Sequence, residues 1–326
     1  MMKKATIESD EEDFEQQPSR LPDSYAKDSS NGPNGILYHQ LRDLDLTHQR
    51  ISTTKGLGLE RFQFLQTLSL RQNLLSKIEG LETLQQLREL DLYDNRIVNI
   101  EGLDALSSLK TLDLSFNKIK DICNIDTLVN LTDIYLVANR ISVIEGLEKL
   151  VLLTQVEFGA NKIRVIENLD ALVNLTQLWL GKNKITKIQG LDKLKNLKLL
   201  SIQSNRLRSI EGLEACVNLE ELYLSHNGIE RIEGVEACVK LRTLDIGNNR
   251  ISVLENVAHL ADLEELWASN NTISSFEEVS SQLGHLAKLE TVYFEGNPLQ
   301  TQQATQYRRK IKIALPTIKK IDATNC

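Results

Sequence analysis

The stretch LRELDLYDNRIVNIEGL, residues 87–103, decides the fold of this chain. Leu90 and Leu92 flank Asp91, and this alternation is the period of a short strand with one buried face. Asn95 ends the strand, and apolar residues then recur at every third position. The stretch therefore predicts one coil of chain, made of a strand, a polar corner and an apolar return.

The same frame recurs along the chain at a constant interval. Asparagines occupy every twenty-second position, at Asn73, Asn95, Asn117, Asn139, Asn161, Asn183, Asn205, Asn227, Asn249 and Asn271. Gln49 takes the equivalent position one repeat before the first of them, and Asn297 takes it one repeat after the last, both at slightly wider spacing. Twelve repeats therefore lie between about residues 36 and 299. Their pattern is the leucine-rich-repeat signature.

One coil of this kind cannot bury its own leucines, so the coils have to stack into a solenoid. We expect an α/β solenoid, a horseshoe whose concave face is a parallel β-sheet. Such a short repeat leaves little room for a full helix, so the convex segments are expected to be 3₁₀ or short helical turns. The asparagine amides should bond to backbone groups of the turn and of the neighbouring coil, because an unpaired buried amide costs roughly 1–3 kcal/mol.

The chain divides into three expected regions. Residues 1–34 are acidic and rich in Ser, Pro and Gly, which predicts a disordered tail. The twelve repeats occupy residues 35–299, and the last repeat is four residues longer than most. Residues 300–326 break the frame and are expected to form a C-terminal cap with one helix over residues 303–315, before Pro316.

Composition excludes several classes of protein. The four cysteines do not form a disulfide framework, since Cys216 and Cys238 occupy the same position of adjacent repeats, where a small buried residue is expected. We expect neither a signal peptide nor a transmembrane segment, and hence a location in the cytosol or nucleus. The histidines lack metal-ligand spacing, and a phosphate-binding glycine loop is missing. The sequence therefore predicts a protein that is not an enzyme and that carries no cofactor or metal.

Two rows of side chains should line the concave face. In each repeat one residue lies between the two leucine positions of the strand, as Asp91 does between Leu90 and Leu92. We call the column that these residues form the aromatic–acidic row. It runs Asp45, Ser69, Asp91, Asp113, Tyr135, Glu157, Trp179, Ser201, Tyr223, Asp245, Trp267 and Tyr293. The companion row, two residues earlier, runs Asp43, Thr67, Glu89, Thr111, Asp133, Gln155, Gln177, Leu199, Glu221, Thr243, Glu265 and Thr291.

These rows predict a binding face. Five of their members are aromatic, including both tryptophans of the chain; ten are acidic and none is basic. Strands favour aromatic residues, but this preference does not explain why both tryptophans occupy one exposed row. Exposed aromatic residues are typical of binding hot spots. Twelve strands about 4.8 Å apart form an arc of about 50 Å, which fits a folded protein with a basic surface better than a small ligand.

A second column has the opposite charge, and we call it the basic stripe. It is the residue directly after Gln49 or the repeated asparagine and consists of Arg50, Arg96, Lys118, Arg140, Lys162, Lys184, Arg206 and Arg250. The simpler interpretation is a solvated flank whose long side chains cover the edge of the core. The alternative hypothesis is that the acidic residues Glu8–Glu15 contact the basic stripe.

Particular strings resemble a known family. They are the I-E-G-L returns, the string LYLSHNGIE at residues 222–230, and the ending ETVYFEGNPLQ and QYRRKIKIALPTIKKIDAT at residues 290–300 and 306–324. Over residues 36–324 the chain resembles the subunit 7 family of leucine-rich-repeat regulators of protein phosphatase 1.

The resemblance implies a partner and a site. In that family the concave face holds the phosphatase catalytic subunit through acidic and aromatic side chains. The matching positions here are Asp113, Tyr135, Glu157, Trp179, Glu265, Trp267 and Tyr293. Tyr223 and Asp245, from the same aromatic–acidic row, complete the predicted partner-binding set. The resemblance further implies a nuclear and cytoplasmic protein that supports phosphatase function in mitosis and holds an inactive or incompletely metallated enzyme, together with a separate inhibitor protein.

The predicted function is therefore that of a regulatory subunit, monomeric alone, that controls the activity, maturation or localisation of protein phosphatase 1. We expect no membrane contact. A nuclear ribonucleoprotein component and a cytoskeletal scaffold are alternatives, because similar repeats occur in both. A net charge of −7 and an acidic concave face argue against direct contact with nucleic acid, which requires a basic surface.

Overall fold

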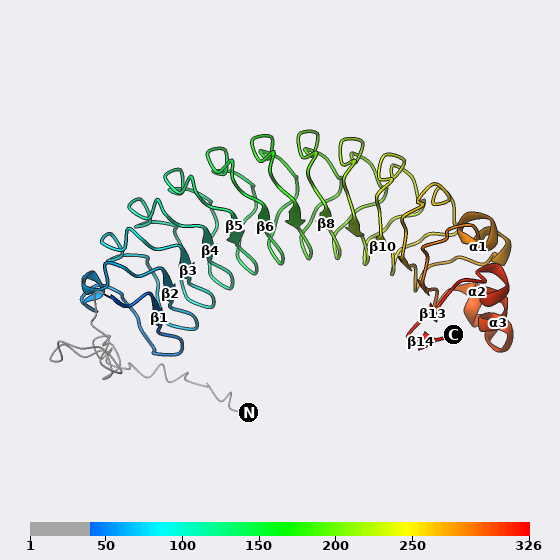
Figure 1. Ribbon diagram of the computed structural model, residues 1–326, viewed down its shortest axis with the longest axis horizontal. Coiled ribbons are helices and arrows are strands. Elements are labelled where there is room, and N and C mark those ends of the chain that lie inside the picture. The colour runs from blue at the N-terminus through cyan, green and yellow to red at the C-terminus, as the bar shows by residue number, and fades with distance from the viewer. Residues whose placement is uncertain (1–39) are drawn as a thin grey trace, which may run out of the picture.

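Each repeat contributes one strand of three residues, and successive strands pair to form one continuous sheet along the inner side of an arch (Figure 1). The computed structural model describes residues 40–326, so the predicted disordered tail and Glu8–Glu15 lie outside the described residues. The sheet is the expected parallel sheet of a leucine-rich-repeat horseshoe. Strands β1 to β12 are Asp43–Asp45, Thr67–Ser69, Glu89–Asp91, Thr111–Asp113, Asp133–Tyr135, Gln155–Glu157, Gln177–Trp179, Leu199–Ser201, Glu221–Tyr223, Thr243–Asp245, Glu265–Trp267 and Thr291–Tyr293.

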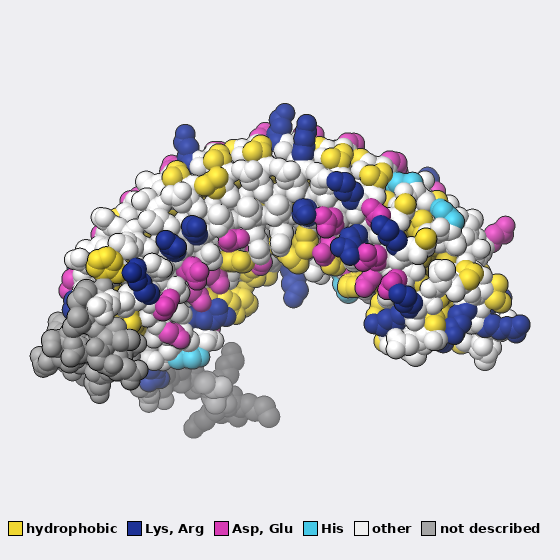
Figure 2. Space-filling view, in the orientation of Figure 1, with side chains coloured by type: hydrophobic (Ala, Val, Ile, Leu, Met, Phe, Trp, Pro, Cys, Tyr) yellow, Lys and Arg dark blue, Asp and Glu magenta, His cyan; other side chains and the backbone are white. Residues whose placement is uncertain are grey.

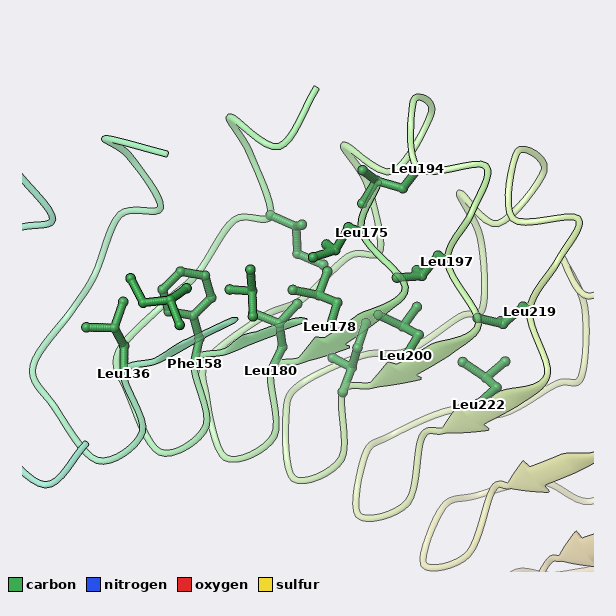
Figure 3. Packing of buried hydrophobic residues seen from close by; sticks show 14 of the residues in the cluster. Leu136, Phe158, Leu175, Leu178, Leu180, Leu194, Leu197, Leu200, Leu219 and Leu222 are labelled. Atoms are coloured by element: carbon green, nitrogen blue, oxygen red, sulfur yellow. The ribbon is translucent and has the colours of Figure 1, made fainter. Parts of the chain in front are cut away.

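The middle residue of every one of these strands is buried, and the leucines of successive coils pack on one another. Figure 3 shows Leu136, Phe158 and Leu180 in line, one from each of three adjacent coils. Burial of each such side chain contributes about 1.5–3 kcal/mol. The core is therefore a continuous column along the arch, and the flanking residues of each strand face the concave side.

The repeated asparagines hold adjacent coils in register, as predicted. The amide nitrogen of Asn95 donates to the carbonyl of Leu92 in its own corner, at 3.1 Å, and to that of Leu70 in the preceding coil, at 3.0 Å. Its amide oxygen accepts from the backbone N–H of Leu75 at 3.0 Å. The residue before each asparagine has a positive φ, 54° at Asp94, so the corner turns in the left-handed conformation.

A second close approach lies on the return segment. Gly102 has a φ of +68°, and a β-carbon there would lie 2.4 Å from the carbonyl oxygen of Ile78 in the preceding coil. Three repeats instead have asparagine at this position, and in one of them Asn124 donates its amide to the carbonyl of Ile100 at 2.9 Å. From Gly80 to Asn256 this position is held by glycine or by an asparagine whose amide bonds to the preceding coil.

The convex segments are tighter than a helix. Backbone bonds from Leu106 to Leu103 and from Leu109 to Leu106, at 2.9 and 3.0 Å, form successive single turns. Within residues 40–326, the convex side carries one longer 3₁₀ segment, η4 (Leu59–Arg61), and one α-helix, α1 (Phe276–Leu283). The longer last repeat makes room for α1, and the Ser275 hydroxyl caps it by accepting from the Glu278 N–H at 3.1 Å.

The C-terminal cap closes the last coil. Helix α2 (Pro298–Thr301) precedes α3 (Ala304–Ala314), which confirms the helix expected before Pro316 and packs against α1. Strand β13 (Lys320–Ile321) pairs with β12, and β14 (Thr324–Asn325) folds back on β13 in antiparallel orientation. The Asp322 carboxylate joins these parts, accepting from the Phe294 N–H at 2.9 Å and the Tyr307 hydroxyl at 3.0 Å.

Cys216 and Cys238 are buried in adjacent coils and are free thiols, which confirms their expected structural position. Burial raises the pKa of Cys216 to about 12 and that of Cys238 to about 11, so both remain protonated at neutral pH. Within the described part of the chain, none of the helices is long and apolar enough to cross a membrane.

Candidate partner-binding face

The register of the sheet brings the two predicted rows onto one surface. The aromatic–acidic row supplies the third residue of each strand and the companion row the first, so that Asp113 pairs with Tyr135 and Trp267 with Tyr293 across neighbouring strands. All nine predicted site residues therefore belong to one continuous sheet. In Figure 2, acidic and hydrophobic side chains lie along the inner side of the arch, with Lys and Arg side chains among them.

Four rings of the aromatic–acidic row contact one another and form what we call the aromatic ladder. The ring centroids of Trp179 and Tyr223 are 6.4 Å apart and nearly parallel; those of Tyr223 and Trp267 are 6.0 Å apart, and those of Trp267 and Tyr293 are 6.1 Å apart. Trp179, Tyr223 and Trp267 come from every second strand, and such strands are roughly 9.6 Å apart. The rings therefore lean toward one another over the strand that separates them.

This leaning corrects one prediction. The aromatic–acidic row is not exposed throughout, because Ser201 and Asp245, which lie between the ladder rings, are only 1% and 9% exposed. The Asp245 carboxylate accepts from the backbone N–H of Gly247 at 3.0 Å, and burial raises its pKa. Asp245 thus supports the aromatic ladder from beneath and does not offer a free carboxylate to a partner.

The companion row holds three of the rings by their polar atoms. The indole N–H of Trp267 donates to the Glu265 carboxylate at 2.8 Å, and the Tyr223 hydroxyl donates to Glu221 at 2.6 Å. The indole of Trp179 makes a longer bond, 3.4 Å, to the residue two positions before it. Glu265, predicted as a contact residue, therefore also orients Trp267. The repeated spacing of an acid two residues before a ring was the sequence signal for this arrangement.

Acidic residues dominate the middle of the face. Burial raises the pKa of Asp113, and the nearby charge of Asp91 raises it further. Burial likewise raises the pKa of Glu157, with a smaller contribution from Asp113, and burial together with these acids raises the pKa of Tyr135. These carboxylates have lost part of their hydration without forming an ion pair. We call Asp113, Tyr135 and Glu157 the acidic cluster; a basic partner would satisfy it.

A third group was missed by sequence reasoning because it lies outside both rows. The rings of Tyr93 and Phe116 are 4.8 Å apart, and the guanidinium of Arg71 lies 3.8 Å from the Tyr93 ring centre and 3.2 Å from the Asp91 carboxylate. Phe116 is 46% exposed, and its φ of 56° is the left-handed conformation that recurs before each repeated asparagine. We call Tyr93 and Phe116 the N-terminal aromatic pair; exposed aromatic rings are typical of contact surfaces.

Over residues 40–326, no group of three or more His, Cys, Asp and Glu side chains is arranged to hold a metal ion. A hollow of about 620 Å³ lies on the flank that precedes the strands, lined by residues such as Thr154, Asn174 and Thr176, away from both rows. Threonines and asparagines of successive coils line it, together with Leu152 and Lys198.

Comparison with known proteins supports the fold and the resemblance. The family described as Leucine Rich repeats (2 copies) matches residues 85–128, 173–215 and 217–261. An internalin from Listeria monocytogenes has a TM-score of 0.70 at 22% identity, with 89% of this chain and 88% of that chain covered. The APL1 leucine-rich repeat domain has a TM-score of 0.66 at 22% identity, with 79% and 69% covered. At this identity these structures show the fold alone.

Shorter but closer matches occur among curated proteins. Protein phosphatase 1 regulatory subunit SDS22 of Schizosaccharomyces pombe is 54% identical over 49 residues, 15% of each chain. Protein phosphatase 1 regulatory subunit 7 of Homo sapiens is 61% identical over 36 residues, 11% of this chain and 9% of that protein. The matches thus span only a small part of the length of these relatives. They confirm the resemblance that the sequence strings suggested.

Proposed function

We propose that this chain, a leucine-rich-repeat protein that resembles the regulatory subunits of protein phosphatase 1, binds the catalytic subunit of that phosphatase with its concave face. The names of its relatives point to the partner. The aromatic ladder beside the acidic cluster carries the assignment of the face. It concentrates partly exposed rings and acids without ion-pair partners on a surface large enough for a folded protein.

The two components of the face have different physical roles. Rings held by neighbours and by hydrogen bonds lose little freedom on binding, so the aromatic ladder is pre-organised to anchor a partner. The partly dehydrated carboxylates of the acidic cluster favour a surface rich in Lys and Arg. Charge complementarity of this kind mainly speeds encounter and selects orientation. A basic partner with an apolar centre fits both.

The regulatory consequence follows from differential affinity. A protein that binds one state of an enzyme more tightly than another shifts the enzyme toward that state. By this route the chain would control the activity, maturation or localisation of the phosphatase, including in mitosis. The proposal extends to a monomeric, non-enzymatic scaffold of the nucleus and cytoplasm that carries no cofactor, shares its partner with a separate inhibitor protein and contacts neither nucleic acid nor membrane.

The test is a binding titration of the full chain against purified phosphatase 1 catalytic subunit by calorimetry. Replacing Trp179 and Trp267 together by Ala should weaken binding by at least about 30-fold, equal to about 2 kcal/mol. Phe64→Ala is the matched control, because Phe64 is 39% exposed but lies outside both rows. Unchanged affinity in a double variant that retains its circular dichroism spectrum and melting temperature would overturn the assignment of the face.

A further inference from the structure

The basic stripe is a feature that binding at the concave face does not use. Its central six members, Arg96, Lys118, Arg140, Lys162, Lys184 and Arg206, occupy six successive coils. Five of them are exposed and Lys184 is partly exposed. Their backbone N–H groups bond to the preceding coil, at 2.8 Å from Arg96 to Leu75 for example, which fixes the register. The stripe is thus a regular row of cations that follows the arch at the coil spacing of about 4.8 Å.

None of these six side chains forms an ion pair with any residue in the described range 40–326. The flank that precedes the strands behaves differently. There Lys198 pairs with Glu220 at 3.0 Å, and Arg242 pairs with Glu264 at 2.9 Å, each with the next coil. The fold therefore pairs charges between coils where adjacent positions differ in sign. In the basic stripe adjacent positions have the same sign.

A solvated flank does not require this arrangement. A mixture of acidic and basic side chains would keep the flank soluble, and the aliphatic parts of these side chains would cover the edge of the core equally well. Six cations in succession repel one another, and they do so in a chain whose net charge is −7. Such a row gains most from an anionic ligand that is long, narrow and multiply charged.

We infer that the basic stripe docks an acidic peptide segment, namely residues 8–15 of this chain. These residues read ESDEEDFE and carry six carboxylates, which matches the six central cations in number. They lie outside the described residues, and the assignment rests on their charge and on the length of chain between them and the solenoid.

Chain length permits this contact. Residues 16–39 separate the acidic segment from the first described residue. A flexible linker of that length would span on the order of 25–30 Å. Arg96 lies two coils beyond β1, roughly 10 Å along the sheet, and the central six extend about 25 Å further. Because the segment is covalently attached, its effective concentration is on the order of millimolar, so even a weak contact forms.

The surroundings of the basic stripe favour a peptide over a nucleic acid. The concave face, with ten acidic residues and no basic residue in its two rows, borders the stripe on one side. A nucleic acid strand carries phosphates and bases over a wider path and would meet that negative surface. An extended peptide is narrow enough to follow a single column of side chains.

The experiment measures fluorescence anisotropy of a labelled synthetic peptide of residues 7–16 with the full-length chain. In a tail-neutralised chain, Glu8, Glu11, Glu12 and Glu15 become Gln, and Asp10 and Asp13 become Asn. Without its own competitor this chain should bind the peptide at least about tenfold more tightly than wild type at about 50 mM salt, and the difference should disappear at about 500 mM salt.

Charge reversal then locates the contact. Lys118→Glu, Arg140→Glu and Lys162→Glu together, in the tail-neutralised chain, should abolish peptide binding. The matched control is Lys149→Glu, Lys193→Glu and Lys195→Glu, three exposed residues outside the stripe with the same change in charge; it should weaken binding by less than about threefold, since its contribution is long-range only.

Three results would overturn the inference. One is equal peptide affinity of the wild-type and tail-neutralised chains, which would assign the stripe to an outside partner. Another is an equal loss in the control triple variant. The last is that a uridine oligonucleotide binds more tightly than the peptide at the same salt concentration and loses this binding when the charges of the stripe are reversed. That result would make the stripe a nucleic-acid site. Thermal melts of all variants identify any that fail to fold.

Discussion

The two halves of the concave face use the same frame for different purposes. In the N-terminal half the aromatic–acidic row supplies Asp45, Asp91 and Asp113, and the charge of Asp91 in the adjacent strand helps to raise the pKa of Asp113. In the C-terminal half it supplies Trp179, Tyr223, Trp267 and Tyr293, whose ring centroids lie between 6.0 and 6.4 Å from their neighbours. The backbone is the same in both halves, three residues per strand in parallel register.

The two halves of the sheet are therefore suited to different steps of binding, one to holding the partner in place and the other to speeding its approach. Rings stabilise one another before any partner arrives, so the C-terminal half is pre-organised. Carboxylates in adjacent strands cannot do so: Asp91 pairs with Arg71 at 3.2 Å, whereas the cost of burying Asp113 is recovered when a cation of the partner approaches. The N-terminal half is therefore expected to set the rate and salt dependence of association, and the C-terminal half its lifetime.

The largest expected effect comes from removing the central ring of the aromatic ladder. Trp267→Ala loses contacts to both Tyr223 and Tyr293 and should weaken phosphatase binding by about 2 kcal/mol or more, mostly through faster dissociation. Surface plasmon resonance measures both rates. Tyr93→Ala in the N-terminal half is the comparison and should cost less. A larger loss for Tyr93→Ala would reverse the assignment of anchor and steering surfaces.

A bulky side chain introduced beneath the rings of the aromatic ladder should have the next largest effect. Ser201 is 1% exposed between Trp179 and Tyr223, so Ser201→Phe should overpack the site and lower the free energy of unfolding by about 1–3 kcal/mol. Urea denaturation measures the loss. Ser69→Phe is the matched control, since the neighbouring strands carry Asp45 and Asp91 there. Equal losses in both variants would show that the rings do not close over Ser201.

The smallest expected effect is the removal of one buried charge. Burial raises the pKa of Asp113 above its ordinary value of 3.8, so the wild-type chain loses stability as pH rises through that raised pKa. Asp113→Asn avoids this loss and should raise the melting temperature at pH 7 by about 1–3 °C, with no gain at pH 3, where the carboxyl is protonated in both states.

Asp45→Asn is the control for the charge effect, because hydrogen bonds from Thr47 lower the pKa of Asp45. A carboxylate with a lowered pKa adds stability above its ordinary pKa, so this variant should not gain stability at pH 7. Scanning calorimetry compares the two variants across pH. A gain at Asp45, or a loss at Asp113, would contradict the assignment of burial as the cause.

Much of the fold was predictable because its determinants are local and repeated. The constant spacing of the asparagines, their burial, and the alternation around Leu90 and Leu92 all act within one coil and the next. The C-terminal helix before Pro316 was likewise predictable. The helix α1 was not, because the longer repeat showed where residues were added but not that Ser275 would cap them.

The site was predictable as a surface but not residue by residue. The strand period alone assigns both rows to the concave face. It does not reveal the N-terminal aromatic pair, since Tyr93 and Phe116 belong to turns that follow different strands and meet only in the stacked solenoid. The predicted partner and the contact set remain predictions that the experiments above address, and the nuclear and cytoplasmic location remains a prediction.

By itself the sequence determined the horseshoe, its concave rows and their acidic character, because a short period repeated over twelve coils leaves one way to bury the leucines. Only the tertiary structure decided which members of a row a partner can reach. Ser201 and Asp245 hold the same repeat position as Trp179 and Trp267, yet they are buried. The reason is that large rings lean across neighbouring strands to shed water, and the contact joins residues two repeats apart in the chain, as Trp179 and Tyr223 are.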